Sequence, residues 1–229
     1  PQTLKALQAE FEKITPEQNL ECKVQFRGDA AQETKAETLS NPLDSLPRAD
    51  ISSEANKLIK KLNDKDWKTR SEGLEALDNF LTVNRTGIQP NGLNDLMAAL
   101  KYRLSDSNKN LVRHAIQIIG KLAVALGTGF KLYAKNLIAE LTKSLSDKVP
   151  NIRSETVSTF DKMAMEVGPE IIINYILPLL NGENTEAKME ALNWALKYHT
   201  YLPKADLKGN INSLVHALQD RALEVRTLA

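Results

Sequence analysis

The residues of this chain whose types and spacing suggest a chemical role are the basic side chains that close a motif repeated five times. Each copy begins with Leu, usually carries Asp two residues later, and closes with Arg or Lys. Such side chains recognise charge, because Lys and Arg bind carboxylates and phosphates through hydrogen bonds and ionic attraction. The copies run over residues 62–70, 104–113, 145–153, 180–188 and 218–226.

Catalytic and metal-binding groups are not indicated by the sequence. His114, His199 and His216 are scattered, and none has a second ligand at metal-binding spacing. The segment 127–129 reads Gly-Thr-Gly but lacks the third glycine, the preceding strand and the Lys of a nucleotide loop. Cys22 is the single cysteine, which excludes an intrachain disulfide and fits a reducing compartment. We therefore predict a binding module, not an enzyme, with no cofactor and no metal.

The spacing of the motifs predicts the fold. The closing basic residues lie about 40 residues apart, and apolar residues at helical spacing flank each motif, which is typical of HEAT-type helix pairs. Before the second motif the apolar stripe runs from Leu93 to Leu104, and the stripe after it runs from Leu111 to Leu126 and ends at Gly127. No long segment alternates with period two, so we expect an all-α α-solenoid without a sheet.

Each motif is predicted to be the turn inside a helix pair, and these turns stack along one edge of a solenoid. The Asp carboxylate would accept backbone N–H groups that the helix start leaves free. The closing cation lies in the first turn of the second helix, where the helix dipole disfavours a positive charge. Some other interaction is therefore expected to stabilise it there. For Arg113 and Arg153 two explanations stay open: either a partner binds them, or they pair with acidic residues of neighbouring repeats.

Charge and composition limit the partners. Lys and Arg total 30 and Asp and Glu total 29, so the net charge is +1, but the predicted turns are locally basic. This pattern points to an acidic protein surface or, less well, to a nucleic-acid backbone. From the sequence we expect the apolar runs to be too short to span a membrane, and the start of the chain does not resemble a signal peptide.

The repeat also divides the chain. Residues 1–46 do not follow it, and we expect there one amphipathic helix and a polar linker. That helix either docks on the first repeat or belongs to a preceding partial unit. Residues 47–229 would hold five repeats, the last incomplete, and a chain that starts with Pro looks like an excised piece of a longer protein.

Trp67 is the residue that stands out in the turns. It could pack under the first repeat, as Leu111 and Ile152 would in theirs. It lies earlier in its motif, however, at a position where other copies carry polar residues or Pro150. An exposed Trp at a turn tip is typical of a binding hot spot.

The segment 64–74, Asp-Lys-Asp-Trp-Lys-Thr-Arg-Ser-Glu-Gly-Leu, resembles the first turn of a TOG domain. TOG domains are the tubulin-binding units of the ch-TOG/minispindles microtubule polymerases, with relatives in the CLASP family. The segments 46–51 and 104–113 are similar to a later unit of that array, the fourth. The resemblance covers residues 43–229 and implies a flat paddle of helix pairs whose turn edge binds the αβ-tubulin heterodimer.

Carried over by position, the resemblance assigns the first turns to β-tubulin and the last turns to α-tubulin. Trp67 would be the β-tubulin anchor, supported by Lys65. The other implied contacts are Asn108 and Lys109 in the second turn, Lys148 and Val149 in the third, Lys188 in the fourth, and Arg221 and Arg226 in the fifth. Two positions depart from the family pattern, since Ala222 stands where Asn is usual and Gly182 where Asp is usual.

The function that the resemblance implies is non-catalytic. One TOG domain of a microtubule polymerase or stabiliser would capture a tubulin dimer, or bind a microtubule, together with sister TOG domains in the same chain. The expected location is the cytoplasm, on microtubules, spindle and centrosome. Two other readings are a HEAT scaffold that binds partner helices on its concave face, and a condensin-like nucleic-acid binder.

Overall fold

The computed structural model describes residues 48–84, 87–89, 92–204 and 207–229, all within a compact unit that spans Asn41–Ala229. The predicted helix and linker over residues 1–46 lie outside these residues, so that prediction stays untested. The described helices are α2 (Ser52–Leu62), α3 (Trp67–Val83), α4 (Asn94–Arg103), α5 (Lys109–Leu126), α6 (Lys131–Ser144), α7 (Pro150–Val167), α8 (Pro169–Ile176), α9 (Thr185–Lys197), α10 (Leu207–Leu218) and α11 (Leu223–Leu228). Three 3-10 segments connect them: η2 (Gly127–Phe130), η3 (Leu177–Asn181) and η4 (His199–Lys204).

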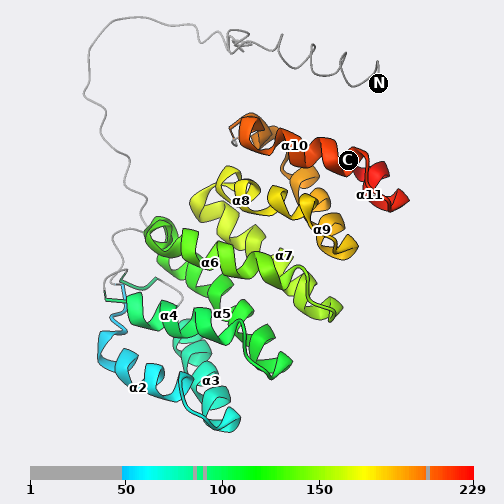
Figure 1. Cartoon of the computed structure of the whole chain (residues 1–229). Coiled ribbons are helices and arrows are strands. Elements are labelled where there is room, and N and C mark those ends of the chain that lie inside the picture. The colour runs from blue at the N-terminus through cyan, green and yellow to red at the C-terminus, as the bar shows by residue number, and fades with distance from the viewer. Residues whose placement is uncertain (1–47, 85–86, 90–91, 205–206) are drawn as a thin grey trace, which may run out of the picture. The chain divides into compact units, whose positions relative to one another are not determined.

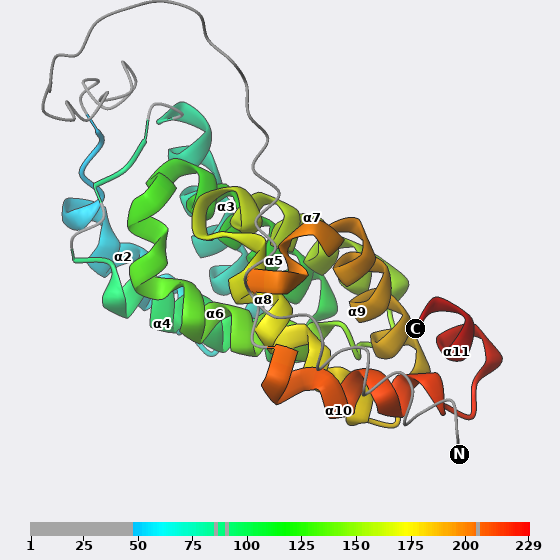
Figure 2. The same ribbon diagram turned by 90° about the horizontal axis from the view of Figure 1, so that it is seen from above.

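The helices form two layers, as Figures 1 and 2 show from two directions. The first layer holds α2, α4, α6, α8 and α10, and the second holds α3, α5, α7, α9 and α11. Each first-layer helix is joined to its second-layer partner by a turn, and equivalent helices stack on one another. The predicted all-α solenoid of HEAT-type helix pairs is therefore confirmed. Within the described residues the only β pairing is an isolated bridge between Ala49 and Ile88.

The core runs through all five pairs as one cluster of buried apolar residues. The stripe predicted from Leu111 to Leu126 is buried along its length, and it packs against α7. Gly120 permits this close approach, because a Cβ there would lie only 3.1 Å from Thr159 Oγ1. Gly127 and Gly168 end α5 and α7 with positive φ angles of 56° and 96°, a conformation that glycine adopts without a steric penalty.

One stretch is more apolar than the sequence analysis expected. Lys109–Ser144 is long and apolar enough, by length and composition, to pass as a membrane span. It is not one helix, because η2 separates α5 from α6. Half of its most apolar window is buried inside the unit, where α5 packs between α3 and α7. Core helices pass the same test, and the apolarity of α5 follows from its central position.

Candidate protein-binding edge

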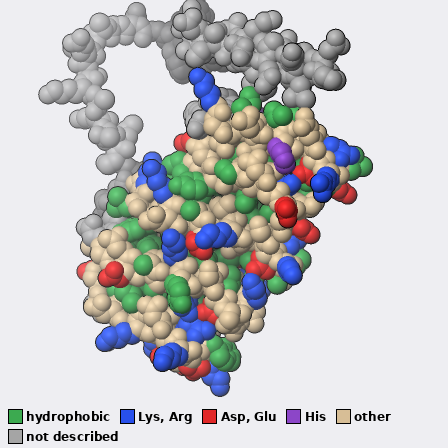
Figure 3. Space-filling view, viewed as in Figure 1, with side chains coloured by type: hydrophobic (Ala, Val, Ile, Leu, Met, Phe, Trp, Pro, Cys, Tyr) green, Lys and Arg blue, Asp and Glu red, His purple; other side chains and the backbone are tan. Residues whose placement is uncertain are grey.

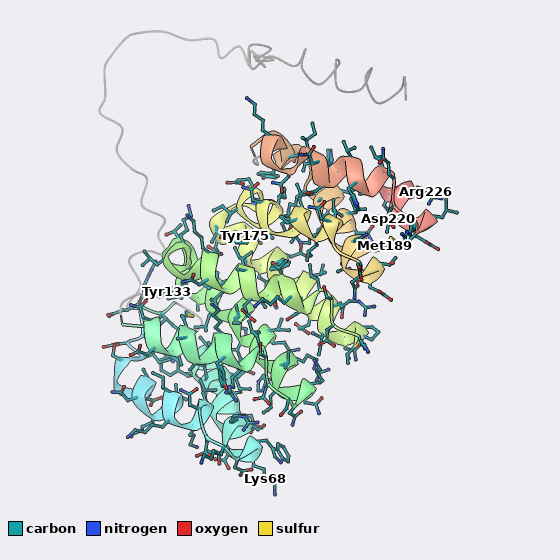
Figure 4. All side chains as sticks on the ribbon, in the orientation of Figure 1. Lys68, Tyr133, Tyr175, Met189, Asp220 and Arg226 are labelled. Atoms are coloured by element: carbon teal, nitrogen blue, oxygen red, sulfur yellow. The ribbon has the colours of Figure 1, made fainter. Side chains whose placement is uncertain are left out.

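The turns inside the helix pairs lie along one margin of the unit, which we call the turn edge: residues 63–66, 104–108, 145–149, 182–184 and 219–222. In Figure 4, Lys68 marks one end of this edge and Asp220 and Arg226 mark the other, while Tyr133 lies on the opposite margin. Figure 3 shows charged side chains of both signs along the turn edge. The turn edge thus carries charges of both signs, and the charge that it offers to a partner depends on which side chains are already paired with one another.

The repeated Asp organises each turn. Its Oδ1 accepts a hydrogen bond from the backbone N–H two residues later, at 2.8 Å for Asp64, 3.0 Å for Asp106, and 2.9 Å for both Asp147 and Asp220. The predicted role of Asp as a turn residue is therefore confirmed. The fourth turn has Gly182 in this position, and there the N-cap Asn184 accepts the N–H of Ala187 at 2.8 Å.

Cations of one repeat pair with the Asp of the next repeat, which ties the turns into a ladder. The side chains of Arg70 and Asp106 are 10% and 1% exposed, so this rung is buried. The rung from Lys109 to Asp147 joins Nζ to Oδ2 over 2.5 Å, and the Lys109 side chain remains 56% exposed. The rungs are Arg70–Asp106, Lys109–Asp147 and Lys188–Asp220.

Three closing arginines also fold back onto their own turn. In each, Nη1 donates to the carbonyl oxygens of the turn Asp and of the residue after it. These arginines are Arg70, Arg153 and Arg226. The guanidinium group thus satisfies carbonyl oxygens of the turn that precedes the helix, which explains a cation at an unfavourable end of the helix dipole. Arg153 Nε lies 3.9 Å from Glu190 of the next repeat, so pairing with a neighbouring acid is the better of the two readings for this residue.

The structure corrects two sequence predictions about these cations. Lys188 was expected on the exposed turn edge, but it is 6% exposed and its ammonium group pairs with the buried Asp220. Because this ion pair is buried, Lys188 does not present a cation to a partner. In the second turn an extra residue shifts the register, so the buried Val112 occupies the position of Arg70, and Arg113 points to solvent.

The remaining predicted contacts lie where a partner could reach them. Trp67 is the first residue of α3 and half of its side chain is exposed, with a relative accessibility of 50%. Its N-cap, Asp66, accepts the N–H of Lys68, so the turn fixes the backbone beneath the indole. In the described part of the chain Lys65, Lys148 and Arg221 are exposed and form no ion pair. Val149, the N-cap of α7, is also exposed.

Besides Lys109, which pairs with Asp147, two further predicted contacts are exposed only in part or are already engaged. Asn108 is half-buried and caps α5, since its side chain accepts the N–H of Asn110 at 3.0 Å. Arg226 is exposed, although its Nη1 closes the fifth turn. Either side chain keeps polar atoms for a partner, but replacing it would also disturb its own turn.

Sequence reasoning missed two exposed apolar residues near the turns. Leu223 begins α11 as Trp67 begins α3, and it is 64% exposed. Alignment of the motifs on their N-cap residues, Asp66 and Ala222, would have found it. Tyr102, near the end of α4, is 69% exposed, and no periodic signal marks it.

Comparison with known proteins agrees with this architecture. Residues 48–229 match the family described as CLASP N terminal. MOR1 of Arabidopsis thaliana is 32% identical over 239 residues, which cover all of this chain and 12% of that protein. Mini spindles of Drosophila melanogaster is 33% identical over 194 residues, which cover 81% of this chain and 9% of that protein. The chain thus spans a small part of the length of these curated relatives.

Solved structures with the same fold include TOG domains. One, described as "Structural Basis of Microtubule Plus End Tracking by XMAP215, CLIP-170 and EB1", matches with a TM-score of 0.69 and 27% identity over 81% of this chain and 80% of that chain. Another, Drosophila melanogaster Mini spindles TOG3, shares the fold with a TM-score of 0.58 and 18% identity over 76% of this chain and 77% of that chain.

The fold and its laddered turn edge define a HEAT-type α-solenoid of the TOG class. Within that class, the chain belongs to the CLASP N-terminal family.

Proposed function

We propose that residues 48–229 are a non-catalytic tubulin-binding domain that captures the αβ-tubulin heterodimer on the turn edge. The observation that carries the proposal is the exposed indole of Trp67 at the tip of the first turn. An apolar ring held on a capped, rigid helix start loses little side-chain entropy on binding, which suits a hot spot.

The relatives support this function. A solved structure with a TM-score of 0.68 and 16% identity, which supports the fold alone, is described as "Structural Basis of Tubulin Recruitment and Assembly by Microtubule Polymerases with Tumor Overexpressed Gene (TOG) Domain Arrays". MOR1, mini spindles and the Dictyostelium discoideum centrosomal protein 224 are sequence relatives. We infer that the domain acts with sister TOG domains in a microtubule polymerase or stabiliser, in the cytoplasm on microtubules, spindle and centrosome.

The proposed contact set follows the turn edge from one end to the other. The β-tubulin end would use Trp67 and Lys65, followed by Asn108 and Lys109 in the second turn. The middle would use Lys148 and Val149, and the α-tubulin end Arg221 and Arg226. Lys188 is left out because it is buried in its pair with Asp220.

Analytical ultracentrifugation of the chain with purified αβ-tubulin tests the proposal. We expect one domain to sediment with one tubulin dimer. Duplex DNA in place of tubulin serves as the second arm. If tubulin does not bind, the proposed function is wrong, and tight DNA binding in its place would favour a nucleic-acid function.

A further inference from the structure

A polar notch of about 290 Å³ opens on the turn edge between the first and second turns. We call it the Arg103 notch. It is lined by Asp64 and Lys65 in the first turn, by Asp106 in the second turn, by Tyr102 and Arg103 at the end of α4, and by Arg70 of α3. It lies beside the turn that carries Trp67, so a partner seated on that indole would also cover the notch.

The notch holds more positive than negative charge. Its cations are Lys65, Arg70 and Arg103, and its carboxylates are Asp64 and Asp106. Asp106 serves both guanidinium groups, since Arg70 Nε and Arg103 Nη1 lie 2.8 Å and 2.6 Å from its Oδ2. Asp64 directs its Oδ1 to the N–H of Asp66 in its own turn. One positive charge therefore remains without a carboxylate among the described residues that line the notch.

Among the residues that line the notch, Arg103 has a hydrogen-bond donor that is not satisfied. Its side chain is 5% exposed, and its Nε is buried without a hydrogen-bond partner among the described residues. Its guanidinium carbon lies 4.6 Å from the centroid of the Tyr102 ring, which covers it and is itself 69% exposed. Burial lowers the pKa of Arg103, and the neighbouring Arg70 charge lowers it further, against the opposing effect of Asp106. A buried guanidinium in this position gains from an additional acceptor.

We propose that the Arg103 notch binds one carboxylate from an acidic side chain of the protein seated on the turn edge. A carboxylate fits better than a phosphate for two reasons. It is planar and matches the guanidinium fork. Its single negative charge equals the single unmatched positive charge, whereas a phosphate dianion would leave one negative charge unmatched beside Asp64 and Asp106. This inference rests on the proposed function, because it assigns a subsite within the same binding edge.

An NMR titration tests the notch without tubulin. Sodium acetate is added to the ¹⁵N-labelled 229-residue chain, and sodium chloride at matched ionic strength is the reference. We expect acetate, but not chloride, to shift with saturation the backbone amide signals of Lys65 and of Ser105 and Ser107, which also line the notch. Lys65→Gln should weaken the acetate response several-fold, and Lys148→Gln, two turns away, should leave it unchanged. Equal shifts with acetate and chloride would overturn the proposal, as would an equal loss in both variants.

A second experiment connects the notch to tubulin. Ser107→Glu places a carboxylate at the notch, so it should abolish the acetate response and lower tubulin affinity about tenfold, equivalent to about 1.4 kcal/mol. Asn79→Glu, an exposed position on α3 away from the turns, adds the same charge and should lower affinity far less. An equal effect of the two variants would overturn the subsite. Tubulin binding without an acetate response contradicts only the notch. An acetate response without tubulin binding supports the carboxylate site and contradicts the proposed function.

Discussion

Arg70 of the first helix pair holds both carboxylate oxygens of Asp106 in the second turn, with Nε 2.8 Å from Oδ2 and Nη2 3.1 Å from Oδ1. Arg103 adds a third contact to Oδ2 at 2.6 Å, and the N–H of Asn108 donates to Oδ1 at 3.0 Å. The Asp106 side chain is 1% exposed. The position of the first turn relative to the second is therefore fixed by one buried carboxylate.

Removing this carboxylate should destabilise the fold. Asp106→Ala leaves two buried guanidinium groups without their counter-charge, and we expect a loss of about 3–5 kcal/mol in the free energy of unfolding. Urea denaturation measures it. The matched control is Glu72→Ala, which breaks the Lys61–Glu72 pair, whose side chains are 44% and 63% exposed. That change should cost less than about 1 kcal/mol. Similar losses in the two variants would contradict the assigned role of the buried rung.

The turn carboxylates should make stability fall in acid. Burial raises the pKa of Asp147, but hydrogen bonds from Lys109 and the N–H of Val149 outweigh burial and lower the pKa overall. Asp106 and Asp220 likewise have lowered pKa values. A folded-state pKa below the unfolded value means that the contribution is present above about pH 4 and is lost as the pH falls through the folded pKa.

We therefore expect the melting temperature to drop below about pH 4. The drop should be shallower in Asp147→Asn, which removes one of the titrating groups. Differential scanning calorimetry from neutral pH into acid gives both profiles. Parallel acid profiles for the wild type and Asp147→Asn would show that this carboxylate does not contribute as proposed.

Tyr198 should ionise at unusually high pH. Burial first, and then the charge and hydrogen bond of Asp161, raise the pKa of Tyr198 to about 12. Its hydroxyl donates to Asp161 Oδ1 over 3.0 Å, and Trp194 Nε1 donates to the same oxygen over 3.1 Å. Because the unfolded pKa is about 10, this group's stabilising contribution is complete below that pH and is lost as the pH rises toward 12.

An ultraviolet titration of tyrosinate absorbance measures this pKa directly. The wild type should show a late phase near pH 12 that is missing in Tyr198→Phe. Tyr102→Phe is the control, since Tyr102 is largely exposed, and it should keep the late phase. If Tyr198→Phe also kept the late phase, the assignment of the raised pKa to Tyr198 would be wrong.

Charge reversal on the turn edge should slow tubulin association. Lys148→Glu and Arg221→Glu each place a negative charge at an exposed turn, so the association rate should fall several-fold and its salt dependence should weaken. Stopped-flow measurements at two salt concentrations provide the rates. The control is Lys131→Glu with Lys135→Glu, exposed positions on α6 away from the turns. Equal slowing by the α6 pair would contradict binding by the turn edge.

The helix pairs could be predicted from the sequence because burial imposes a regular period. The helix α5 packs against both α3 and α7, so the residues from Leu111 to Leu126 that face them are apolar. The helical spacing of these apolar residues is visible in the sequence. Gly127 and Gly168 could be predicted as stops because other residues rarely adopt their positive φ angles. The exposure of Trp67 was left open by the pattern, since a helix start can face either the core or solvent.

The ionic pairs could not be read from the sequence. Lys188 belongs to a basic motif, but its partner Asp220 comes from the next repeat, and only the stacking of repeats reveals that the charge is buried. Arg113 was aligned with Arg70, whereas the longer second turn places Val112 there. The Arg103 notch forms where two turns meet beside the end of α4. A local sequence pattern does not predict this contact between separate segments.

The affinity of Trp67→Glu for αβ-tubulin tests the central claim most directly. Trp67 is half exposed, so the substitution should leave the melting temperature nearly unchanged. Isothermal titration calorimetry should show a loss of at least about 2 kcal/mol in binding free energy, the range of interface hot spots. Leu132→Glu, an exposed apolar residue on α6 away from the turns, is the matched control and should bind as the wild type does. Wild-type affinity in a folded Trp67→Glu variant would contradict tubulin capture by the turn edge.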